Sequence, residues 1–420
     1  MAPPTLLATL IPIILSVYIL SINAESSNDA RNLYTTIFTT NTYNKHVRPI
    51  LDQTDAVDVT VDYFLTGILD FDEQGEKLTT SGYFRISWND YYIQWNKSDF
   101  NNLSIIFVPQ DNVWKPDVVL KNSVSEVKGL GSSFLYVIVY PNGTVVWFPY
   151  MILQSTCNVD ITYIPFDTQN CFLKFEAWSY TKNEVLITVG KKGLNLDEYE
   201  ANSVWTIVSW SVDTKDDSSD ATLEFKITLK RKPLFYVLNI IIPIIMLSIL
   251  NACIFVLSAE SGEKASFSVT TFLSMAVFLT IVASTLPQNS DNISYLGIYL
   301  ELMVGISTLI VIITLFELRF YFRDAIVDPV PKWLIRFQVI VEVIRCSRRS
   351  KVNPSAHDQN DDNKDDRAKS NEPLRVGNRP LEVTWKNVCN ALDFVFFWIF
   401  LLIIFTTTLA IYITASTRTF

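Results

Sequence analysis

Two closely spaced cysteines are the first residues of this chain whose chemistry can be inferred from type and spacing. Cys157 and Cys171 enclose residues 158–170, and the middle of that segment reads Ile164-Pro165-Phe166-Asp167. Cysteines pair as disulfides in oxidising compartments outside the cytoplasm. A pair at this spacing can close a short loop there. Its commonest meaning is a structural disulfide in a secreted β domain.

A second pattern lies in the apolar segment 265–286, which is rich in hydroxyl side chains. Certain positions recur at steps of four and three, the period that keeps side chains on one helix face. They are Ser266, Thr270, Leu273, Val277, Thr280 and Ser284. In a ring of such helices the hydroxyls would line a wet pore, and the leucine and valine would exclude water and ions until the helices move. Hydroxyls can instead hold packed helices together, but the order of polar and apolar steps favours a pore.

Two carboxylates, Glu260 and Glu263, stand just before that segment. A ring of carboxylates at a narrow mouth concentrates cations and repels anions. Glu263 could instead pair with the adjacent Lys264, but neighbouring residues on a helix point in different directions. We therefore predict that these acids select cations.

The composition is that of a membrane protein. The chain has 420 residues, 49% of them hydrophobic, and a mean hydropathy of +0.23. The formal net charge of −9 argues against a nucleic-acid partner and suits a vestibule that attracts cations. The only histidines in the sequence, His46 and His357, are isolated, and the sequence shows no catalytic or metal-ligand constellation. We predict neither an enzyme nor a cofactor or metal.

The first half of the chain predicts a folded domain outside the cell. Residues 1–24 form an apolar leader, interpreted as a signal peptide. Residues 31–48 predict a short amphipathic helix, and the alternating runs between residues 57 and 229 predict a β-sandwich. We assign residues 25–232 to this extracellular domain. Sequons at Asn96, Asn102 and Asn142 predict glycosylation on its surface.

Four apolar segments predict membrane-spanning helices, because each is long enough to cross about 30 Å of hydrocarbon. They lie at residues 233–257, 265–286, 294–317 and 391–414. Basic residues mark the intervening stretch 318–390 as cytoplasmic. Within it, residues 331–346 predict an amphipathic helix along the membrane, and residues 347–379 a disordered segment. Cys253, Cys346 and Cys389 lie in or beside these stretches and are predicted to be free thiols.

The order of these features resembles that of one known family. The Ile164–Asp167 core, the tract Lys174-Phe175-Glu176-Ala177-Trp178-Ser179-Tyr180 and the four apolar segments follow one another as in the Cys-loop receptors, the pentameric ligand-gated ion channels. The chain is similar to a nicotinic acetylcholine receptor-like subunit of non-alpha type, over residues 30–415 except the variable cytoplasmic segment. The resemblance implies a Cys157–Cys171 disulfide, an immunoglobulin-like extracellular β-sandwich with an N-terminal helix, and a four-helix transmembrane bundle. It also implies a pentamer in the plasma membrane, in this family often at synapses.

The same resemblance bears on ions and partners. The tract Glu260-Ser261-Gly262-Glu263-Lys264 is similar to that of cation-selective members, whereas anion-selective members carry an inserted Pro-Ala before a basic residue. At the outer mouth, where acetylcholine-receptor subunits often carry an acid, this chain has Ser284, so high calcium permeability is not predicted. The implied partners are four further subunits, monovalent cations, membrane lipid and a small-molecule ligand at a subunit interface.

The family's ligand site is a box of aromatic side chains between two subunits, whose faces attract an amine. Trp178, Trp114 and Tyr180 match principal-face segments, but Lys121 replaces the tyrosine expected after Trp114. The segment between Trp210 and Phe225 has neither the vicinal cysteines nor the tyrosines of acetylcholine-binding alpha subunits. On the complementary face, Tyr83 takes the place usually held by tryptophan.

These departures argue against acetylcholine binding at this chain's own principal face. Lys121 would repel a cationic agonist, and Trp178 has the alternative of being only a core residue. Three outcomes stay open. The chain could lend Tyr83 and the strand around residues 137–146 to another subunit's site. It could form a homomer with a different ligand, anionic given Lys121. It could be an accessory or orphan subunit that binds no agonist itself.

Residues that would couple ligand binding to the pore are also implied by the resemblance. Lys230-Arg231-Lys232-Pro233 precedes the first apolar segment, and Glu73 ends a hairpin that would face it. The family implies a Glu73–Arg231 pair, with Pro165 and Phe166 resting on the loop after Pro287. The basic run could also serve only as a membrane-surface anchor. Two rival classes are a receptor that captures ligand without conducting, and an anion channel, which Glu260 and Glu263 oppose.

Overall fold

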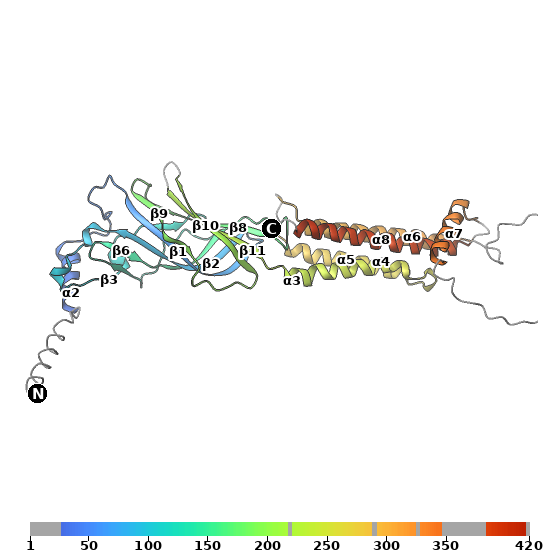
Figure 1. Cartoon of the computed structure of the whole chain (residues 1–420), viewed down its shortest axis with the longest axis horizontal. Coiled ribbons are helices and arrows are strands. Elements are labelled where there is room, and N and C mark those ends of the chain that lie inside the picture. Colours follow the sequence, from blue (N-terminus) through green and yellow to red (C-terminus); the bar gives the residue numbers. More distant parts are fainter. Residues whose placement is uncertain (1–26, 217–220, 288–291, 325–327, 347–383, 417–420) are drawn as a thin grey trace, which may run out of the picture. The chain divides into compact units, whose positions relative to one another are not determined.

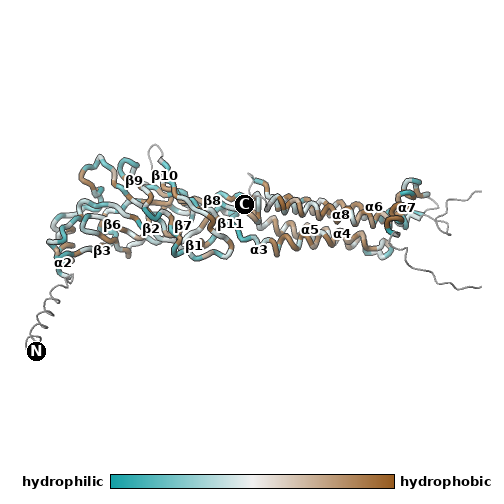
Figure 2. The backbone as a smooth tube through the Cα atoms, in the orientation of Figure 1, coloured by the Kyte–Doolittle hydropathy of each residue, from teal (hydrophilic) through white to brown (hydrophobic). Residues whose placement is uncertain are grey.

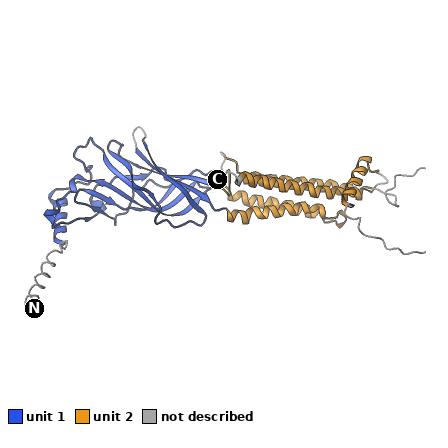
Figure 3. Ribbon diagram, in the orientation of Figure 1, with its two compact units in different colours: residues 1–160, 168–232 blue, residues 161–167, 233–420 orange. Residues whose placement is uncertain are grey.

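The computed structural model describes residues 27–216, 221–287, 292–324, 328–346 and 384–416 (Figure 1). The chain divides into two compact units, coloured separately in Figure 3. The β unit comprises residues 1–160 and 168–232, and the helical unit comprises residues 161–167 and 233–420. The predicted signal peptide and the predicted disordered segment, 347–379, lie outside the described residues.

The described part of the β unit begins with a helix that starts and ends earlier than predicted. Helix α2 spans Ser27–Thr35 and continues as a π-helical turn over Thr36–Thr40, whereas the sequence pattern indicated residues 31–48. The helix ends before Thr42, whose φ of 48° is a left-handed conformation that a right-handed helix does not contain. Leu33 and Ile37, four residues apart, form its buried side.

Two sheets make up most of the β unit. The seven-stranded sheet has the order β3-β5-β6-β2-β1-β9, with β7 paired to β2, and the four-stranded sheet has the order β10-β11-β8-β4. The strands are β1 Val57–Asp72, β2 Lys77–Asn89, β3 Ile106–Pro109, β4 Val118–Leu120, β5 Tyr136–Val139, β6 Thr144–Trp147, β7 Tyr150–Thr156, β8 Thr168–Ala177, β9 Val185–Asn195, β10 Trp205–Asp216 and β11 Ala221–Arg231. Short 3₁₀ turns at Tyr91–Ile93, Lys97–Phe100 and Gln110–Asn112 connect some of them.

Aromatic rings from both sheets meet in one core. Tyr63 of β1 stacks on Phe84 of β2 with ring centroids 4.7 Å apart. Phe84 in turn meets Phe175 of β8 edge to face at 5.0 Å, and Phe175 meets Phe225 of β11 at 5.9 Å. Because strand side chains alternate between faces, the apolar positions point inward from each sheet. The predicted β-sandwich is confirmed.

Four helices in the described part of the helical unit are long and apolar enough to cross a membrane. They cover Leu234–Val256, Lys264–Thr285 (α5), Tyr295–Tyr321 (α6) and Trp385–Thr414, the last within α8, Trp385–Ser416. Figure 2 shows how strongly hydrophobic these helices are. Helix α4, Ile242–Ala252, contacts α5, α6 and α8, and α6 also contacts α5 and α8, so the helices form a bundle.

The first of these helices is irregular. It consists of α3, Leu234–Tyr236, a π turn over Val237–Ile241, α4, and a 3₁₀ turn over Cys253–Val256. Pro243 lies in the first turn of α4. Proline has no N–H to donate to the preceding turn, and the chain takes the wider π geometry just before it.

Helices α6 and α8 are longer than predicted. Helix α6 extends to Tyr321 and α8 begins at Trp385, both within residues 318–390, which the sequence pattern assigned to the cytoplasmic loop. The rings of Phe320 and Trp385 stack with centroids 5.6 Å apart, and both pack with Leu334 of α7, Lys332–Cys346. Aromatic contacts between helices therefore extend the bundle beyond the purely apolar segments.

Candidate pore and ligand-binding surfaces

The residues predicted to line a pore lie on the exposed face of α5. Ser266, Thr270, Leu273, Val277, Thr280 and Ser284 are all exposed in the single chain, Leu273 at 59% and Val277 at 51%. The opposite side of the helix, with Ser268, Thr271, Met275 and Val282, is buried. The hydroxyl-and-leucine stripe therefore faces away from the chain's own bundle, which is the orientation that a pore-lining helix needs.

The hydroxyls of this stripe donate to their own helix. Thr270 donates to the carbonyl of Ser266 at 2.8 Å, Thr280 to that of Ala276 at 3.0 Å, and Ser284 to that of Ile281 at 2.7 Å. A hydroxyl that has donated its proton still has lone pairs that accept. The exposed face therefore offers oxygen acceptors, which suit cations better than anions.

The two predicted selectivity acids differ in their surroundings. The Nζ of Lys386 is 3.3 Å from Oε1 of Glu260, and both side chains are more than half exposed. Hydrogen bonds from Tyr321 and Lys386 lower the pKa of Glu260. Glu263 is exposed and has no ion-pair partner among the described residues. The charge of Glu260 is thus balanced within the chain, whereas that of Glu263 is not.

Lys264 does not pair with its neighbour Glu263. It is fully buried, with Nζ 2.9 Å from Oε2 of Glu317 in α6 and bonded to Oδ1 of Asp393 in α8. Neither acid was predicted from the sequence to pair with Lys264. Their position within apolar segments could have indicated a charged partner, because ionisable residues inside membrane segments are rare and usually paired.

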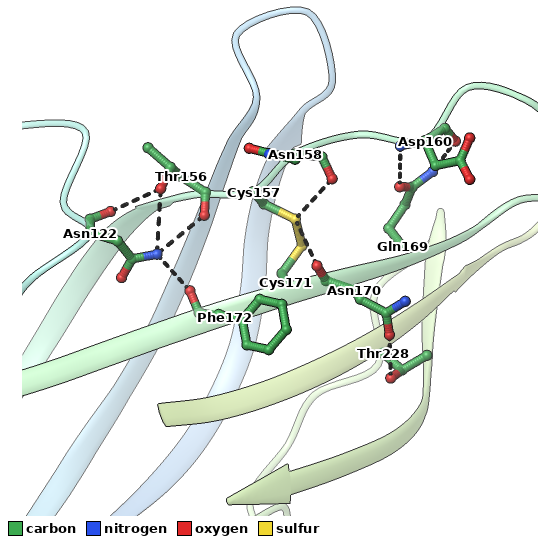
Figure 4. The surroundings of a disulfide bond; sticks show 10 residues. All are labelled: Asn122, Thr156, Cys157, Asn158, Asp160, Gln169, Asn170, Cys171, Phe172 and Thr228. Carbon is green, nitrogen blue, oxygen red and sulfur yellow. Dashed lines mark hydrogen bonds between the residues drawn. A yellow bond between two sulfur atoms is a disulfide. The ribbon is translucent and has the colours of Figure 1, made fainter. Parts of the chain in front are cut away.

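The predicted disulfide between Cys157 and Cys171 is confirmed (Figure 4). Side chains also hold the two arms of the loop together. Gln169 accepts from the backbone N–H of Asp160 at 2.9 Å and donates to its carbonyl at 2.8 Å. Asn122 donates to the carbonyls of Thr156 and Phe172, at 3.2 and 2.8 Å. The base of the loop is therefore fixed to the β unit by one covalent bond and several polar ones.

The tip of this loop, residues 161–167, belongs to the helical unit. The backbone N–H of Tyr295 donates to the carbonyl of Thr162 at 3.0 Å. Phe166 meets Tyr412 of α8 edge to face at 6.2 Å between ring centroids. Pro165 and Phe166 also line a cavity of about 280 Å³ together with side chains of α6 and α8. The predicted contact with the loop after Pro287 falls on residues 288–291, outside the described residues.

The Glu73–Arg231 pair implied by the resemblance is present in the β unit. The guanidinium Nη1 of Arg231 is 2.6 Å from Oε1 of Glu73, and the arginine side chain is fully buried. Its guanidinium also lies 4.3 Å from the ring centroid of Trp205. A buried arginine that loses a carboxylate partner is costly, so the Glu73–Arg231 pair stabilises this end of the β unit. Its role in gating stays a prediction.

The two tryptophans expected on the principal face have different environments. Trp178 is 59% exposed, so the alternative that it serves only as core is wrong. Asp117 positions it by accepting the backbone N–H groups of Trp178 and Ser179, at 3.2 and 2.7 Å. Trp114 is only 2% exposed, and its ring lies 6.3 Å from that of Tyr180. Trp114 therefore supports Tyr180 from within the core and cannot itself meet a ligand in this arrangement.

The repulsion of a cationic agonist by Lys121 stays a prediction, but the structure shows that the lysine is paired. Its Nζ is 2.6 Å from Oε2 of Glu176, and Thr222 donates to the same oxygen at 3.4 Å. The Lys121–Glu176 pair carries no net charge. The cation that the sequence placed in the site is therefore neutralised by an acid from the neighbouring strand β8.

A second charge cluster on the same sheet escaped the sequence analysis. Glu224 lies between Lys174, at 3.3 Å, and Lys215, at 2.6 Å. Burial opposes ionisation of Glu224, but hydrogen bonds from Lys215 and Lys174 outweigh it and lower the pKa. Lys174 and Glu224 stand directly opposite each other in the β8–β11 ladder. Strand alternation could have indicated a shared face, but the sequence does not reveal which strands pair.

Tyr83, which is predicted to lie on the complementary side, is accompanied by an aromatic ring and a carboxylate. Its ring stacks on Phe64 with centroids 4.8 Å apart and planes 4° apart. Its hydroxyl donates to Oε1 of Glu198 at 3.0 Å. Burial and the bond to Glu198 raise the pKa of Tyr83, so it is a neutral phenol at physiological pH. Tyr83 was predicted from the sequence, whereas Phe64 and Glu198, which lie on another strand and a distant loop, were not.

The remaining predicted positions are surface asparagines and thiols. Asn96, Asn102 and Asn142 are all exposed, as a glycosylation site must be. Cys253 and Cys389 are free thiols, as predicted. The side chain of Cys346 lies outside the described part of the structure, so its free thiol stays a prediction.

Two family models match consecutive parts of the chain. The neurotransmitter-gated ion-channel ligand binding domain matches residues 30–233, and the neurotransmitter-gated ion-channel transmembrane region matches residues 240–380. The chain belongs to the neurotransmitter-gated ion-channel family, the Cys-loop receptors. This is a family of ligand-gated channels and not a class of enzymes. Its members place the N-terminal domain outside the cell and pass the plasma membrane several times.

Within the family the chain is similar to nicotinic acetylcholine receptor subunits. It is 31% identical to human neuronal acetylcholine receptor subunit alpha-3 over 80% of this chain and 66% of the relative. It is 34% identical to mouse neuronal subunit alpha-6, over 70% and 60%, and 35% identical to the Xenopus laevis acetylcholine receptor subunit epsilon, over 71% and 62%. The chain thus spans less than two thirds of the length of each of these relatives.

Proposed function

We propose that this chain is a subunit of a pentameric ligand-gated cation channel. The observation that carries this proposal is the exposed stripe of α5. Hydroxyls occupy its two ends, and Leu273 and Val277 occupy its middle. In a ring of five such helices, the leucines and valines would form apolar constrictions that block ions by excluding water, and helix motion would open them.

Cation selectivity follows from the charge at the start of α5. Glu263 is exposed without an ion-pair partner among the described residues, so five copies would form a negative ring. The stripe hydroxyls add acceptor oxygens along the path. Sodium and potassium are the ions that we expect, driven by the membrane potential and the concentration gradients.

The ligand surface favours a contribution from the complementary side. An amine ligand is attracted to aromatic faces and to nearby carboxylates, and Tyr83, Phe64 and Glu198 supply both. The chain's own principal side offers Trp178 as one well-exposed aromatic and a Lys121–Glu176 pair without net charge. We therefore propose that this chain lends its Tyr83 side to a site completed by another subunit.

A second candidate is an accessory subunit that takes part in no agonist site. Its support is the saturation of charged groups on the four-stranded sheet, where Lys121, Lys174 and Lys215 already bind Glu176 and Glu224. Groups that satisfy one another offer little to a ligand. The two candidates differ in whether Tyr83 matters for agonist response.

Voltage clamp of oocytes separates these candidates. The chain is expressed alone and with an acetylcholine receptor alpha subunit, and surface protein is confirmed by labelling. We expect acetylcholine-gated current only on co-expression, reversing near zero in sodium saline and unmoved by chloride replacement. Tyr83→Ala should raise the half-maximal agonist concentration about fivefold, because a cation–π contact contributes about 1 kcal/mol. Tyr91→Ala, at an exposed tyrosine elsewhere in the β unit, is the control.

The other outcomes are equally informative. An unchanged response of the Tyr83 variant supports the accessory subunit. A reversal potential that follows chloride contradicts cation selectivity. Surface expression with ligand binding and no current in either condition contradicts conduction and leaves a receptor that only captures ligand.

A further inference from the structure

A cluster of buried charges lies where α5 begins. Lys264, the first residue of the helix, is fully buried. Its Nζ is 2.9 Å from Oε2 of Glu317 in α6 and is bonded to Oδ1 of Asp393 in α8. The ring centroid of Phe255 lies 5.7 Å from the same nitrogen. The ammonium is therefore held inside the bundle by acids from two other helices.

The cluster contains one more carboxylate than ammonium. The second oxygen of Glu317, Oε1, is buried and has no hydrogen-bond partner among the described residues. Removing the ammonium would leave two carboxylates in the interior without compensation, which is strongly unfavourable. The lysine is therefore held by acids from two different helices rather than by a single ion pair.

Lys264 lies next to an acid that is predicted to select cations, so the position of its ammonium affects the charge there. The residue directly follows Glu263, whose exposed carboxylate has no ion-pair partner among the described residues. A lysine ammonium sits on a flexible four-carbon stem and can turn toward water when it is not held. Turned outward in five subunits, it would stand beside the five Glu263 carboxylates and cancel their charge.

We propose that Glu317 and Asp393 are positioning residues for ion selectivity. They touch no ion. They keep the Lys264 ammonium inside the bundle, so that Glu263 acts unopposed at the mouth of the pore. The effect on ions rests on the proposed channel function, but the position of the ammonium can be tested without any current.

Chemical labelling tests that position. Membranes containing the full chain are treated with a water-soluble N-hydroxysuccinimide ester, and mass spectrometry measures the labelled fraction of each lysine. Lys386, whose side chain is 58% exposed, is the internal reference. We expect Lys386 to be labelled and Lys264 protected in the wild type, and both labelled alike in E317Q/D393N. Equal labelling in the wild type, or protection of Lys264 in the double variant, overturns the proposal.

Single-channel recording tests the consequence. In E317Q/D393N the freed ammonium should lower the inward unitary conductance about twofold or more and reduce the preference for sodium over chloride. The neutral triple variant K264M/E317Q/D393N carries no unpaired charge in the cluster. It should restore the wild-type conductance and reversal potential, since the ammonium does not act at the mouth in the wild type.

Each outcome of these recordings supports or overturns the positioning role of Glu317 and Asp393. A triple variant that conducts more than the wild type would mean that Lys264 already opposes Glu263, which overturns the proposal. Double and triple variants with the same conductance would assign the acids a merely structural role and also overturn it. If the double variant does not assemble, the conductance of the triple variant and the labelling of the wild type still test whether the Lys264 ammonium is kept away from Glu263. If the wild type carries no current, the channel function fails, and the labelling alone decides where the ammonium lies.

Discussion

Both units pair lysines with buried acids, but water reaches the two sets of pairs differently. In the helical unit Lys264 is fully buried between Glu317 and Asp393. On the four-stranded sheet the side chains of Lys121 and Lys215 are 43% and 64% exposed, and only the acids that they cover are buried. Ion pairs open to water contribute little to stability, whereas a buried charge that loses its partner is costly.

This difference in exposure suits lysine–acid pairs to two different roles. The helical cluster fixes one charge at one place, which is what a pore with a defined field requires. The sheet pairs cancel charge on a partly exposed surface, where ion pairs contribute little to stability. Asp90, a buried carboxylate of the β unit, has no lysine partner among the described residues and extends this comparison.

The largest effect is expected for Lys264→Met. The substitution leaves Glu317 and Asp393 buried without a cation, and such a loss costs about 3–5 kcal/mol. We expect little assembled protein at the surface and a markedly lower unfolding temperature in detergent. The matched control is Lys386→Met, which removes an exposed lysine from Glu260 and should change stability by at most about 1 kcal/mol. Equal losses in the two variants would erase the contrast between buried and exposed pairs.

Asp90 predicts a pH dependence of stability in the β unit. Its carboxylate accepts from the hydroxyl of Tyr43 at 2.6 Å and from the backbone N–H of Tyr92 at 3.0 Å. Burial nevertheless raises the pKa of Asp90 to about 6. An ordinary aspartate in an unfolded chain titrates near 3.9 (roughly). The folded state therefore binds the proton more tightly than the unfolded state does.

The sign follows from this difference in proton binding. The stabilisation from protonated Asp90 is complete below about pH 4 and is lost as the pH rises through about 6, at up to ~1.4 kcal/mol per pH unit and ~3 kcal/mol in total. Asp90→Asn should remove this component. Unfolding of the full chain, followed by tryptophan fluorescence between pH 4 and 7, measures the difference between the two proteins. A difference that does not vary with pH would show that Asp90 is ionised throughout.

A smaller effect separates the two acids before α5. Glu263→Gln removes a charge that no partner balances, and we expect the inward unitary conductance to fall about twofold. Glu260→Gln removes an acid that Lys386 already balances, so its conductance should stay closer to that of the wild type. Single-channel recordings of both variants in the same saline provide the comparison. Equal reductions would mean that the Glu260–Lys386 pair does not persist in the assembled channel.

The smallest effect is expected for Lys121→Met on the sheet. Its lysine is 43% exposed, so water already weakens the pair with Glu176, and Thr222 remains as a partner for the acid. The free energy of unfolding should fall by no more than about 1 kcal/mol. Thermal unfolding beside Lys264→Met measures the ratio of the two losses. A loss as large as that of Lys264→Met would show that exposure does not govern the strength of these pairs.

Periodic features of the sequence were predictable because they depend on local geometry. The stripe from Ser266 to Ser284 follows the helical repeat, and the structure exposes all six of its residues on α5. The alternating runs predicted a sandwich for the same kind of reason. The ends of elements were less predictable. The helix at Ser27–Thr40 and the extensions of α6 and α8 depend on a backbone conformation at Thr42 and on ring contacts such as Phe320–Trp385.

Charge partners were the part that sequence reasoning could not assign. Lys264 meets acids 53 and 129 positions away, and Lys121 meets one 55 positions away. The solvent exposure of individual side chains could not be predicted from the sequence either. Trp178 and Trp114 are the same residue type in segments that both match the ligand site, yet one faces solvent and the other lies in the core.

By itself the sequence determined the two kinds of unit, the apolar helices and the stripe on one of them, because spacing along a chain specifies which side chains share a face. The Cys157–Cys171 disulfide was implied by the family resemblance and is confirmed. Only the tertiary structure decided which charges act. It balanced Glu260 with Lys386, buried Lys264 between two acids and neutralised Lys121, and it left Glu263 exposed. The physical reason is that the effect of a charge depends on the groups and the water within a few ångströms of it, and folding alone brings distant residues that close.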